Sequence, residues 1–283
     1  MTIGFQLPPD KRRGHIMGDA SCIAAATLLE WTCVASGAFM AKKGVTMSYL
    51  TMKGGVGKTT LAANITRALA DISPRKILLI DADAQCNLSQ IFLSENELES
   101  GSSRSIYQAF DSSHKLYGPS DLKTIVYANQ TNHSTIDFIA GSFDTFGLVV
   151  ATPRVQKRAH ETFLQFIEQA RSEYDLVVID TNPSATFVTL QALEVSNFLV
   201  APITFDDFSM RGLDLIVRSM RDQYDWLSNP RRIRIVPNKV SRARDERAAE
   251  ARRGARRRRA KDPAPAQSPV AEHAATRLPL RVA

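Results

Sequence analysis

The sequence predicts an α/β fold in which a mostly parallel sheet is covered by helices on both faces. The chain has 283 residues, 44% of them hydrophobic and 23% charged, which suits one large globular domain or two small ones. From residue 44 onward, short β-branched or aliphatic runs alternate with segments of helical periodicity. Such alternation builds βαβ units, and parallel strands of this kind bind ligands at their carboxyl ends.

Six of the apolar runs are expected to be strands, and five segments between them are expected to be helices. The expected strands are 45–51, 76–80, 135–140, 176–179, 198–201 and 233–236. The expected helices are 58–70, 105–110, 153–171, 186–196 and 209–227. The segment 94–135 is otherwise polar and predicts mostly loop.

The net charge of +7 comes from segment 241–283. This segment has 11 Arg and one Lys against five acidic residues, whereas residues 1–240 contain equal numbers of basic and acidic residues. It is dominated by Arg, Ala and Pro, so it cannot bury enough apolar surface to offset the entropy of ordering. We expect a disordered or marginally helical tail, whose arginines either neutralise nucleic-acid phosphates without reading sequence or form a solvated surface.

Residues 1–43 are expected to be an extension that precedes a domain at 44–240. No stretch of the chain has the roughly 18 to 20 uncharged apolar residues that a membrane span needs. The best candidate, 20–40, contains Glu30 and follows a basic cluster, a pattern that also has a passing likeness to a signal peptide. The extension interpretation predicts a cytoplasmic protein.

The cysteines and histidines argue against a zinc centre and a disulfide framework. Three cysteines cannot pair completely, and no CxxC or CxxH spacing occurs among Cys22, Cys33 and Cys86. The histidines show no metal-ligand spacing and are expected on the surface: His15, His114, His133, His160 and His273. A reducing cytoplasm is therefore the expected compartment.

A phosphate-binding loop follows the first expected strand. The run Lys53-Gly54-Gly55-Val56-Gly57-Lys58-Thr59-Thr60 leads directly into the first expected helix. Glycines let such a loop curl so that backbone N–H groups and the helix N-terminus face phosphate oxygens. Lys58 would reach the β- and γ-phosphates, and the Thr59 hydroxyl would ligate magnesium. Met52 stands where the strict pattern has glycine, so this is a variant loop with an additional lysine, Lys53.

Carboxylates follow two further expected strands. Asp81 and Asp83 are two residues apart on an extended chain end and therefore point the same way, as a site for metal and water requires. Asp180 ends the apolar run 176–179, where phosphate-loop enzymes place a carboxylate near magnesium. Each of them alone is also typical of a helix cap or a turn. Next to the phosphate loop, they favour a site for ATP and Mg²⁺.

Taken together, these segments resemble a known family. KGGVGKTT, DADAQCN, DLVVIDTNPSATFVTLQAL and LVAPITFDDFSMRGLDLI look like the deviant Walker A P-loop ATPases of the ParA/MinD group, most closely the ParA-type plasmid and chromosome partition ATPases. The likeness covers about residues 44–240. It implies a cytoplasmic, nucleoid-associated ATPase whose ATP-dependent homodimer binds DNA nonspecifically, works with a ParB-like stimulating partner and does not bind a membrane.

The resemblance also implies the roles of three catalytic residues. Lys53 matches the signature lysine that crosses the dimer to the phosphates of the other subunit. Lys58 matches the Walker lysine, and Asp83 matches the acid that orients the attacking water.

The ligands of Mg²⁺ and ATP follow from the same resemblance. Thr59, Asp81 and Asp180 would hold Mg²⁺, the two acids mostly through water. The remaining ATP contacts would come from Gly54, Gly55, Val56, Gly57, Lys58, Thr59, Thr60 and, by a looser match, Asn238 near the adenine.

The sequence departs from the family pattern in several places. Ala84 and Asn182 replace prolines. After Val240 the family continues with a strand and helices that close the base pocket, whereas this sequence has the Arg-rich segment. The domain at 44–240 is therefore either naturally short or incomplete, and an ATP-binding scaffold without turnover is one alternative.

Two other functions are associated with this type of loop. A MinD-like spatial regulator would need a terminal amphipathic helix with large apolar residues on one face, but Ala is almost the only apolar residue in 241–261. An iron–sulfur reductase would need cysteines that bridge a cluster across a dimer, and Cys86 has no second candidate after it.

Overall fold

The computed structural model describes residues 43–72, 75–100, 104–113, 119–128, 134–204 and 206–239. The expected N-terminal extension, except its last residue Lys43, and the Arg-rich tail lie outside the described residues, as do Cys22, Cys33 and four of the five histidines. His160 is described, and it is half-buried rather than fully on the surface. Its Nδ1 atom lies 2.5 Å from Gln191 Oε1.

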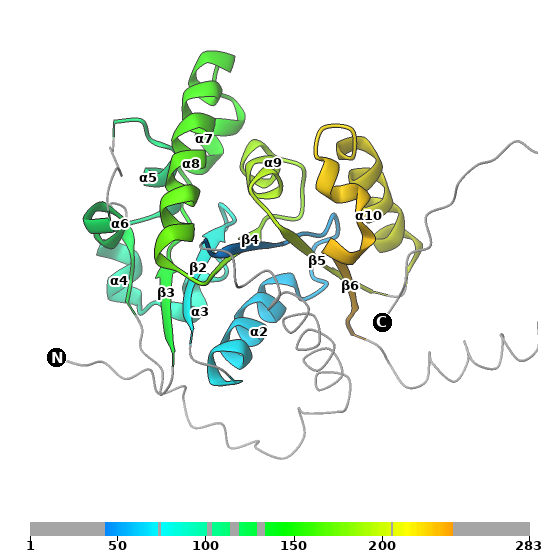
Figure 1. Ribbon diagram of the computed structural model, residues 1–283, viewed down its shortest axis with the longest axis horizontal. Coiled ribbons are helices and arrows are strands. Elements are labelled where there is room, and N and C mark those ends of the chain that lie inside the picture. Colours follow the sequence, from blue (N-terminus) through cyan, green and yellow to red (C-terminus); the bar gives the residue numbers. More distant parts are fainter. Residues whose placement is uncertain are drawn as a thin grey trace, which may run out of the picture. The chain divides into compact units, whose positions relative to one another are not determined.

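Six parallel strands form one sheet in the order β3-β2-β4-β1-β5-β6 (Figure 1). All six predicted strands are therefore confirmed. Their bounds are β1 (Val45–Tyr49), β2 (Lys76–Ala82), β3 (Thr135–Ile139), β4 (Leu176–Thr181), β5 (Phe198–Ile203) and β6 (Ile233–Pro237).

The ends of the strands differ from the prediction in a way that matters for function. β2 and β4 each continue two residues beyond their predicted ends, because the pairing of the two strands extends to Asp81 opposite Asp180 and Ala82 opposite Thr181. β1 instead ends at Tyr49, two residues early. The position where a strand ends depends on its neighbours in the sheet, so it cannot be seen in one run of sequence.

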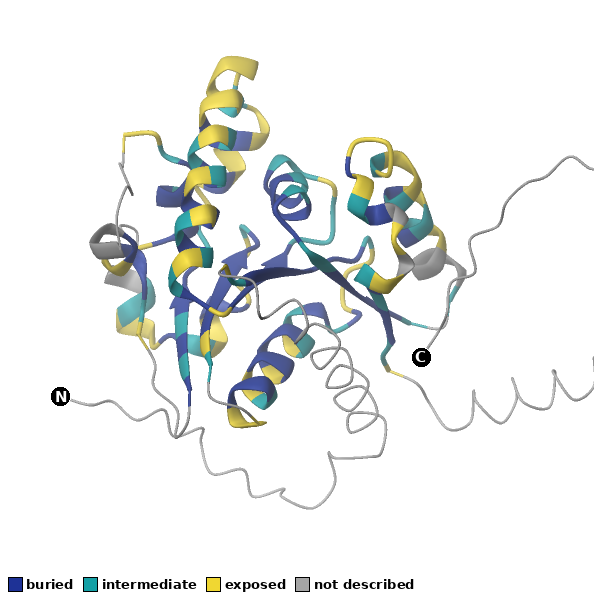
Figure 2. Ribbon diagram, viewed as in Figure 1, coloured by how far each residue is buried: buried dark blue, intermediate teal, exposed yellow. Residues whose placement is uncertain are grey.

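Helices cover both faces of the sheet, as predicted. Figure 1 shows α2 (Lys58–Ile72) on one face and α8 (Pro153–Glu173), α9 (Phe187–Glu194) and α10 (Asp207–Met220) on the other. Every residue of β1 and β4 is consequently buried, and Figure 2 shows these central strands dark. Burial of both faces explains why the strands read as nearly continuous apolar runs.

The helix predicted at 209–227 is shorter in the structure. α10 ends at Met220, whose carbonyl accepts a hydrogen bond from the backbone N–H of Tyr224. After this last helical bond the chain turns, and the buried side chains of Tyr224 and Leu227 join the core formed by β5, α10 and β6. Two short 3-10 turns, η2 (Asp225–Ser228) and η3 (Pro230–Arg232), then lead to β6.

Segment 94–135 contains two short helices besides the predicted one, so its described residues are more helical than expected. Five short helices lie between β2 and α8 in the described residues, and only the third was predicted. Helices of one to two turns show no clear periodicity and depend on packing against the rest of the protein. Their bounds are α3 (Ser89–Phe92), α4 (Glu95–Ser100), α5 (Ile106–Phe110), α6 (Pro119–Ile125) and α7 (Thr145–Val149).

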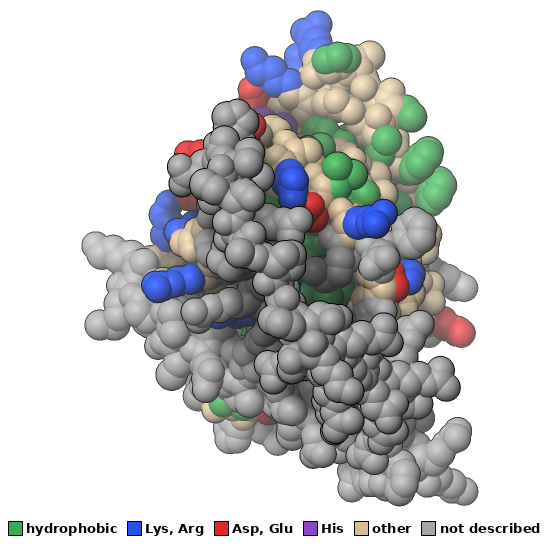
Figure 3. All heavy atoms as spheres, turned by 90° about the vertical axis from the view of Figure 1, so that its right-hand side faces the viewer, with side chains coloured by type: hydrophobic (Ala, Val, Ile, Leu, Met, Phe, Trp, Pro, Cys, Tyr) green, Lys and Arg blue, Asp and Glu red, His purple; other side chains and the backbone are tan. Residues whose placement is uncertain are grey.

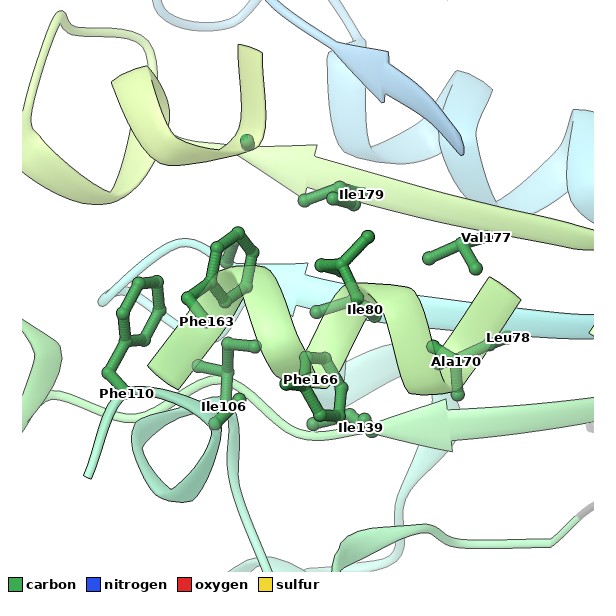
Figure 4. Packing of buried hydrophobic residues seen from close by; sticks show 14 of the residues in the cluster. Leu78, Ile80, Ile106, Phe110, Ile139, Phe163, Phe166, Ala170, Val177 and Ile179 are labelled. Carbon is green, nitrogen blue, oxygen red and sulfur yellow. The ribbon is translucent and has the colours of Figure 1, made fainter. Parts of the chain in front are cut away.

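The larger hydrophobic core lies between α8 and the strands β2, β3 and β4. Figure 4 shows Phe163, Phe166 and Ala170 of α8 packed in one cluster with strand residues such as Ile80, Ile139 and Val177. Their spacing of three and four residues is the apolar stripe that predicted this helix. α5 and α6 contribute further buried side chains to this core. This packing explains why both helices form although the sequence around them is polar.

Candidate nucleotide-binding site

The phosphate loop connects β1 to α2 and is shaped by glycines. Gly55 and Gly57 have φ values of +73° and +90°, which favour glycine. A Cβ atom on Gly57 would lie 2.3 Å from Asn238 Nδ2, whereas a Cβ on Gly54 or Gly55 would meet no atom of the described residues within 4 Å. The loop is thus closed on the Asn238 side and open over Gly54 and Gly55, where phosphates would fit.

Asn238 supports the loop from its closed side. Its side-chain amide donates a hydrogen bond to the Val56 carbonyl (2.8 Å), and its backbone N–H donates to the Ile203 carbonyl (2.7 Å). The structure therefore brings this predicted site residue to the phosphate loop. The predicted contact of Asn238 with adenine stays a prediction.

Lys58 and Asp180 form a buried ion pair at the start of α2. Lys58 Nζ lies 2.6 Å from Asp180 Oδ1, and both side chains are buried. Burial raises the pKa of Asp180, while Lys58 and a hydrogen bond from the Thr59 side chain lower it. The second carboxylate oxygen, Asp180 Oδ2, is buried and has no hydrogen-bond partner among the described residues. A buried carboxylate oxygen beside a threonine hydroxyl fits Mg²⁺, a cation that prefers oxygen ligands.

Asp81 lies beside Asp180 in the paired strands and is fully buried. Its Oδ2 atom accepts hydrogen bonds from the backbone N–H and the hydroxyl of Ser89, at 2.8 and 2.7 Å, and its Oδ1 atom accepts one from the Asp83 N–H. Burial nevertheless raises the pKa of Asp81 to about 7. A divalent cation would favour the charged form of this carboxylate. Sequence reasoning did not identify Ser89, which carries no recognisable motif.

We expect the affinity of the ATP complex for Mg²⁺ to rise between about pH 6 and pH 8. Asp81 must lose its proton to assist binding, and its pKa of about 7 lies in this range. Calorimetric titration of Mg²⁺ at a series of pH values measures this, and Asp81→Asn should remove most of the pH dependence. An equally steep dependence in Asp81→Asn would assign it to another group.

Deprotonation of the same carboxyl group favours Mg²⁺ binding, but it lowers the free energy of unfolding when no cation is bound. The pKa of Asp81 in the folded protein is above the ordinary aspartate value, so the folded state binds the proton more tightly than the unfolded state. Its contribution to the free energy of unfolding is therefore present at low pH and is lost as the pH rises from about 4 to about 7.

Asp83 lies at the same edge of the sheet. Its side chain is nearly buried and accepts a hydrogen bond from the Gln85 N–H (3.0 Å). A Cβ atom on Gly141, just after β3, would lie 2.8 Å from the Asp83 carbonyl, so the loop after β3 passes against this acid. The structure thus brings together the ends of β1, β2, β3 and β4.

Lys53 takes a different direction from the other site residues. Its ammonium group lies 2.8 Å from Asp206 Oδ2 and 3.5 Å from Thr204 Oγ1, in the loop between β5 and α10. The preceding residue, Met52, also faces α10, where a Cβ on Gly212 would come within 2.8 Å of Met52 Cβ. The side chain that breaks the strict glycine pattern is therefore accommodated by a glycine on α10. Sequence reasoning did not single out Asp206.

Asn182, which replaces a family proline, organises the loop after β4. Its side-chain oxygen accepts hydrogen bonds from Thr189 Oγ1 (2.8 Å) and from the N–H and hydroxyl of Ser184 (3.2 and 3.0 Å). These bonds hold the loop between Asp180 and α9.

The part of the chain that the structure describes contains no helix long and apolar enough to cross a membrane.

Comparison with known proteins identifies a family model and a relative that are similar to this chain. The family model described as AAA domain matches residues 44–230. The chromosome-partitioning ATPase Soj of Treponema pallidum is 27% identical over 179 residues, which cover 63% of this chain and 64% of the relative. The chain thus spans less than two thirds of that relative.

Two solved structures share the fold. One is a Borrelia burgdorferi protein bound to AMPPNP and described as a plasmid partition protein, with a TM-score of 0.56 and 22% identity over 71% of this chain and 76% of the other. The other is pNOB8 ParA bound to nonspecific DNA, with a TM-score of 0.50 and 23% identity over 64% and 60% of the two chains. At this identity the two structures support the fold alone.

Proposed function

Because this chain belongs to the AAA domain family of ParA- and Soj-like P-loop ATPases, we propose that it is a Mg²⁺-dependent ATPase of DNA partition. In this proposal ATP favours a homodimer that binds DNA nonspecifically, and a ParB-like partner stimulates hydrolysis that ends the cycle. DNA is proposed as the partner by analogy with pNOB8 ParA, a protein that shares the fold and was solved bound to nonspecific DNA. A location on the nucleoid would follow from it.

The observation that carries the proposal is the cluster at the ends of β1, β2 and β4. Lys58 and Thr59 both contact Asp180, whose buried Oδ2 atom has no hydrogen-bond partner among the described residues, and Asp81 lies opposite it in the sheet. The cation would neutralise phosphate charge during transfer. The open side of the phosphate loop would cradle the phosphates, and Asp83 would orient the attacking water. Tests of Lys58 and Asp83 are described in the Discussion.

Lys53→Ala is expected to bind ATP but to remain monomeric. Lys58 serves the phosphates of its own subunit, so the additional lysine is useful if it meets the negative charge of a second subunit. Sedimentation of the variant with ATP and Mg²⁺ tests this, with Lys43→Ala as control, because Lys43 is also an exposed, ion-paired lysine. A normal ATP-induced dimer of Lys53→Ala would exclude the cross-subunit role.

The Arg-rich segment is expected to contribute to DNA affinity. A chain that ends at Val240 should bind DNA more weakly than the full chain. The logarithm of the binding constant should also fall less steeply with the logarithm of salt, by about 0.9 for each phosphate contact that is lost. Fluorescence anisotropy with a labelled duplex at several salt concentrations measures both. An unchanged slope would mean that these arginines form a solvated tail.

A second candidate function is an ATP-binding scaffold without turnover. It is favoured by the departure of the sequence from the family pattern after Val240. A protein that binds ATP and dimerises, but releases no phosphate above the level of an Asp83→Ala variant, would be such a scaffold.

A further inference from the structure

Five apolar side chains are exposed together around α7 and the start of α8. They are Phe143, Phe146, Val149, Val150 and Val155, and we call them the α7 patch. Phe143 and Val150 are 73% and 75% exposed. The described residues expose only three other large apolar side chains, so the exposure is concentrated here. Figure 3 shows hydrophobic side chains gathered on the upper part of the molecule, near Lys and Arg side chains.

The α7 patch is a preformed surface. The rings of Phe143 and Phe146 stack with their centroids 5.8 Å apart. The Gln156 side chain donates a hydrogen bond to the Leu148 carbonyl (2.8 Å), which ties α7 to α8, and Leu148 itself is buried beneath. A cluster of exposed apolar side chains of this kind is typical of an interaction site.

The α7 patch begins next to the acids of the candidate site. Gly141 lies two residues before Phe143, and its N–H donates a hydrogen bond to Ser89 Oγ (2.8 Å), the same hydroxyl that holds Asp81. A Cβ atom on Gly141 would also come within 2.8 Å of the Asp83 carbonyl. The patch and the site therefore share the carboxyl edge of the sheet.

We propose that the α7 patch contacts a second copy of this chain in the ATP-bound dimer. The inference rests on the proposed function, in which Lys53 reaches the phosphates of the other subunit. Lys53 can reach the phosphates of the other subunit only if the carboxyl edges of the two sheets face each other. The α7 patch lies at the carboxyl edge. The site groups there, such as Lys53, Asp81 and Asp83, are charged and supply little apolar area. A stable dimer needs about 800 Å² from each partner, with aromatic side chains enriched at its centre.

Replacing the two exposed rings tests the proposal. Phe143→Ser combined with Phe146→Ser should raise the dissociation constant of the ATP-bound dimer at least tenfold in sedimentation velocity, with ATP affinity within twofold of the parent. Ile72→Ser is the matched control, because Ile72 is 54% exposed at the end of α2, at the opposite edge of the sheet. It should dimerise normally.

A second measurement uses the unaltered protein and does not depend on how the variants fold. Backbone amides over 143–150 should exchange hydrogen more slowly when ATP and Mg²⁺ are added, and this protection should be absent in Lys53→Ala. If the parent dimerises while the double variant dimerises equally well, or while these amides stay unprotected, the proposal is overturned. The α7 patch would then serve a different protein or a lipid surface, and the proposed ATPase function would stand. If the parent forms no ATP-dependent dimer, the proposed function fails as well.

Discussion

Lys58→Ala is expected to abolish measurable ATP binding, a loss of at least about 100-fold in affinity. The ammonium group of Lys58 is a buried positive charge at the phosphate loop. Charge-assisted hydrogen bonds from such a group to phosphate are roughly twice as strong as hydrogen bonds between neutral groups. Isothermal titration with ATP and Mg²⁺ measures the loss. Unchanged affinity would remove the phosphate loop from the proposed function.

The control must separate binding from folding, because Lys58 also pairs with buried Asp180. Removal of one member of a buried ion pair costs about 3–5 kcal/mol when the remaining charge stays uncompensated. Lys58→Gln keeps a side-chain N–H donor on the side of Asp180 and removes the positive charge. We expect Lys58→Gln to unfold at a higher temperature than Lys58→Ala and to bind ATP as poorly.

Asp83→Ala is expected to retain ATP binding and to lose hydrolysis by about 100-fold or more. Asp83 lies at the carboxyl edge, and its side chain accepts a hydrogen bond from the Gln85 N–H, whereas Lys58 pairs with Asp180, so the binding groups stay in place. Orientation of the attacking water and proton transfer by a positioned side chain contribute roughly 10²–10⁴-fold to a rate. Phosphate release under saturating ATP, together with ATP affinity, gives the two quantities to compare.

Asp83→Asn sharpens this test. The amide oxygen can still accept the hydrogen bond from the Gln85 N–H, so the turn after β2 is preserved while the carboxylate charge is removed. Asp83→Asn should therefore be as inactive as Asp83→Ala. If either variant lost ATP binding as completely as Lys58→Ala, Asp83 would belong to the binding site and not to the hydrolytic step.

Much of the site was visible in the sequence because its groups lie next to one another along the chain. The phosphate loop needs glycines, a lysine and hydroxyls within eight residues, and the strand before it and the helix after it are both strongly patterned. Asp81, Asp83 and Asp180 could be placed near the loop because parallel strands all bring their carboxyl ends to one edge. The same alternation of apolar runs and helices predicted the six strands and the long helices.

The tertiary structure alone decided which groups touch. The pairing of Lys58 with Asp180, of Lys53 with Asp206 and of Asp81 with Ser89 depends on strand order and on the register of β2 against β4, which no single segment encodes. The short helices α6 and α7 pack against the long helix α8, and the periodicity of α3, α4, α6 and α7 is too brief to show in the sequence. The sequence by itself thus determined the fold class and the chemical groups of the site. The contacts between distant segments, including the exposed α7 patch beside Gly141, required the three-dimensional structure because burial and proximity are properties of the whole packed chain.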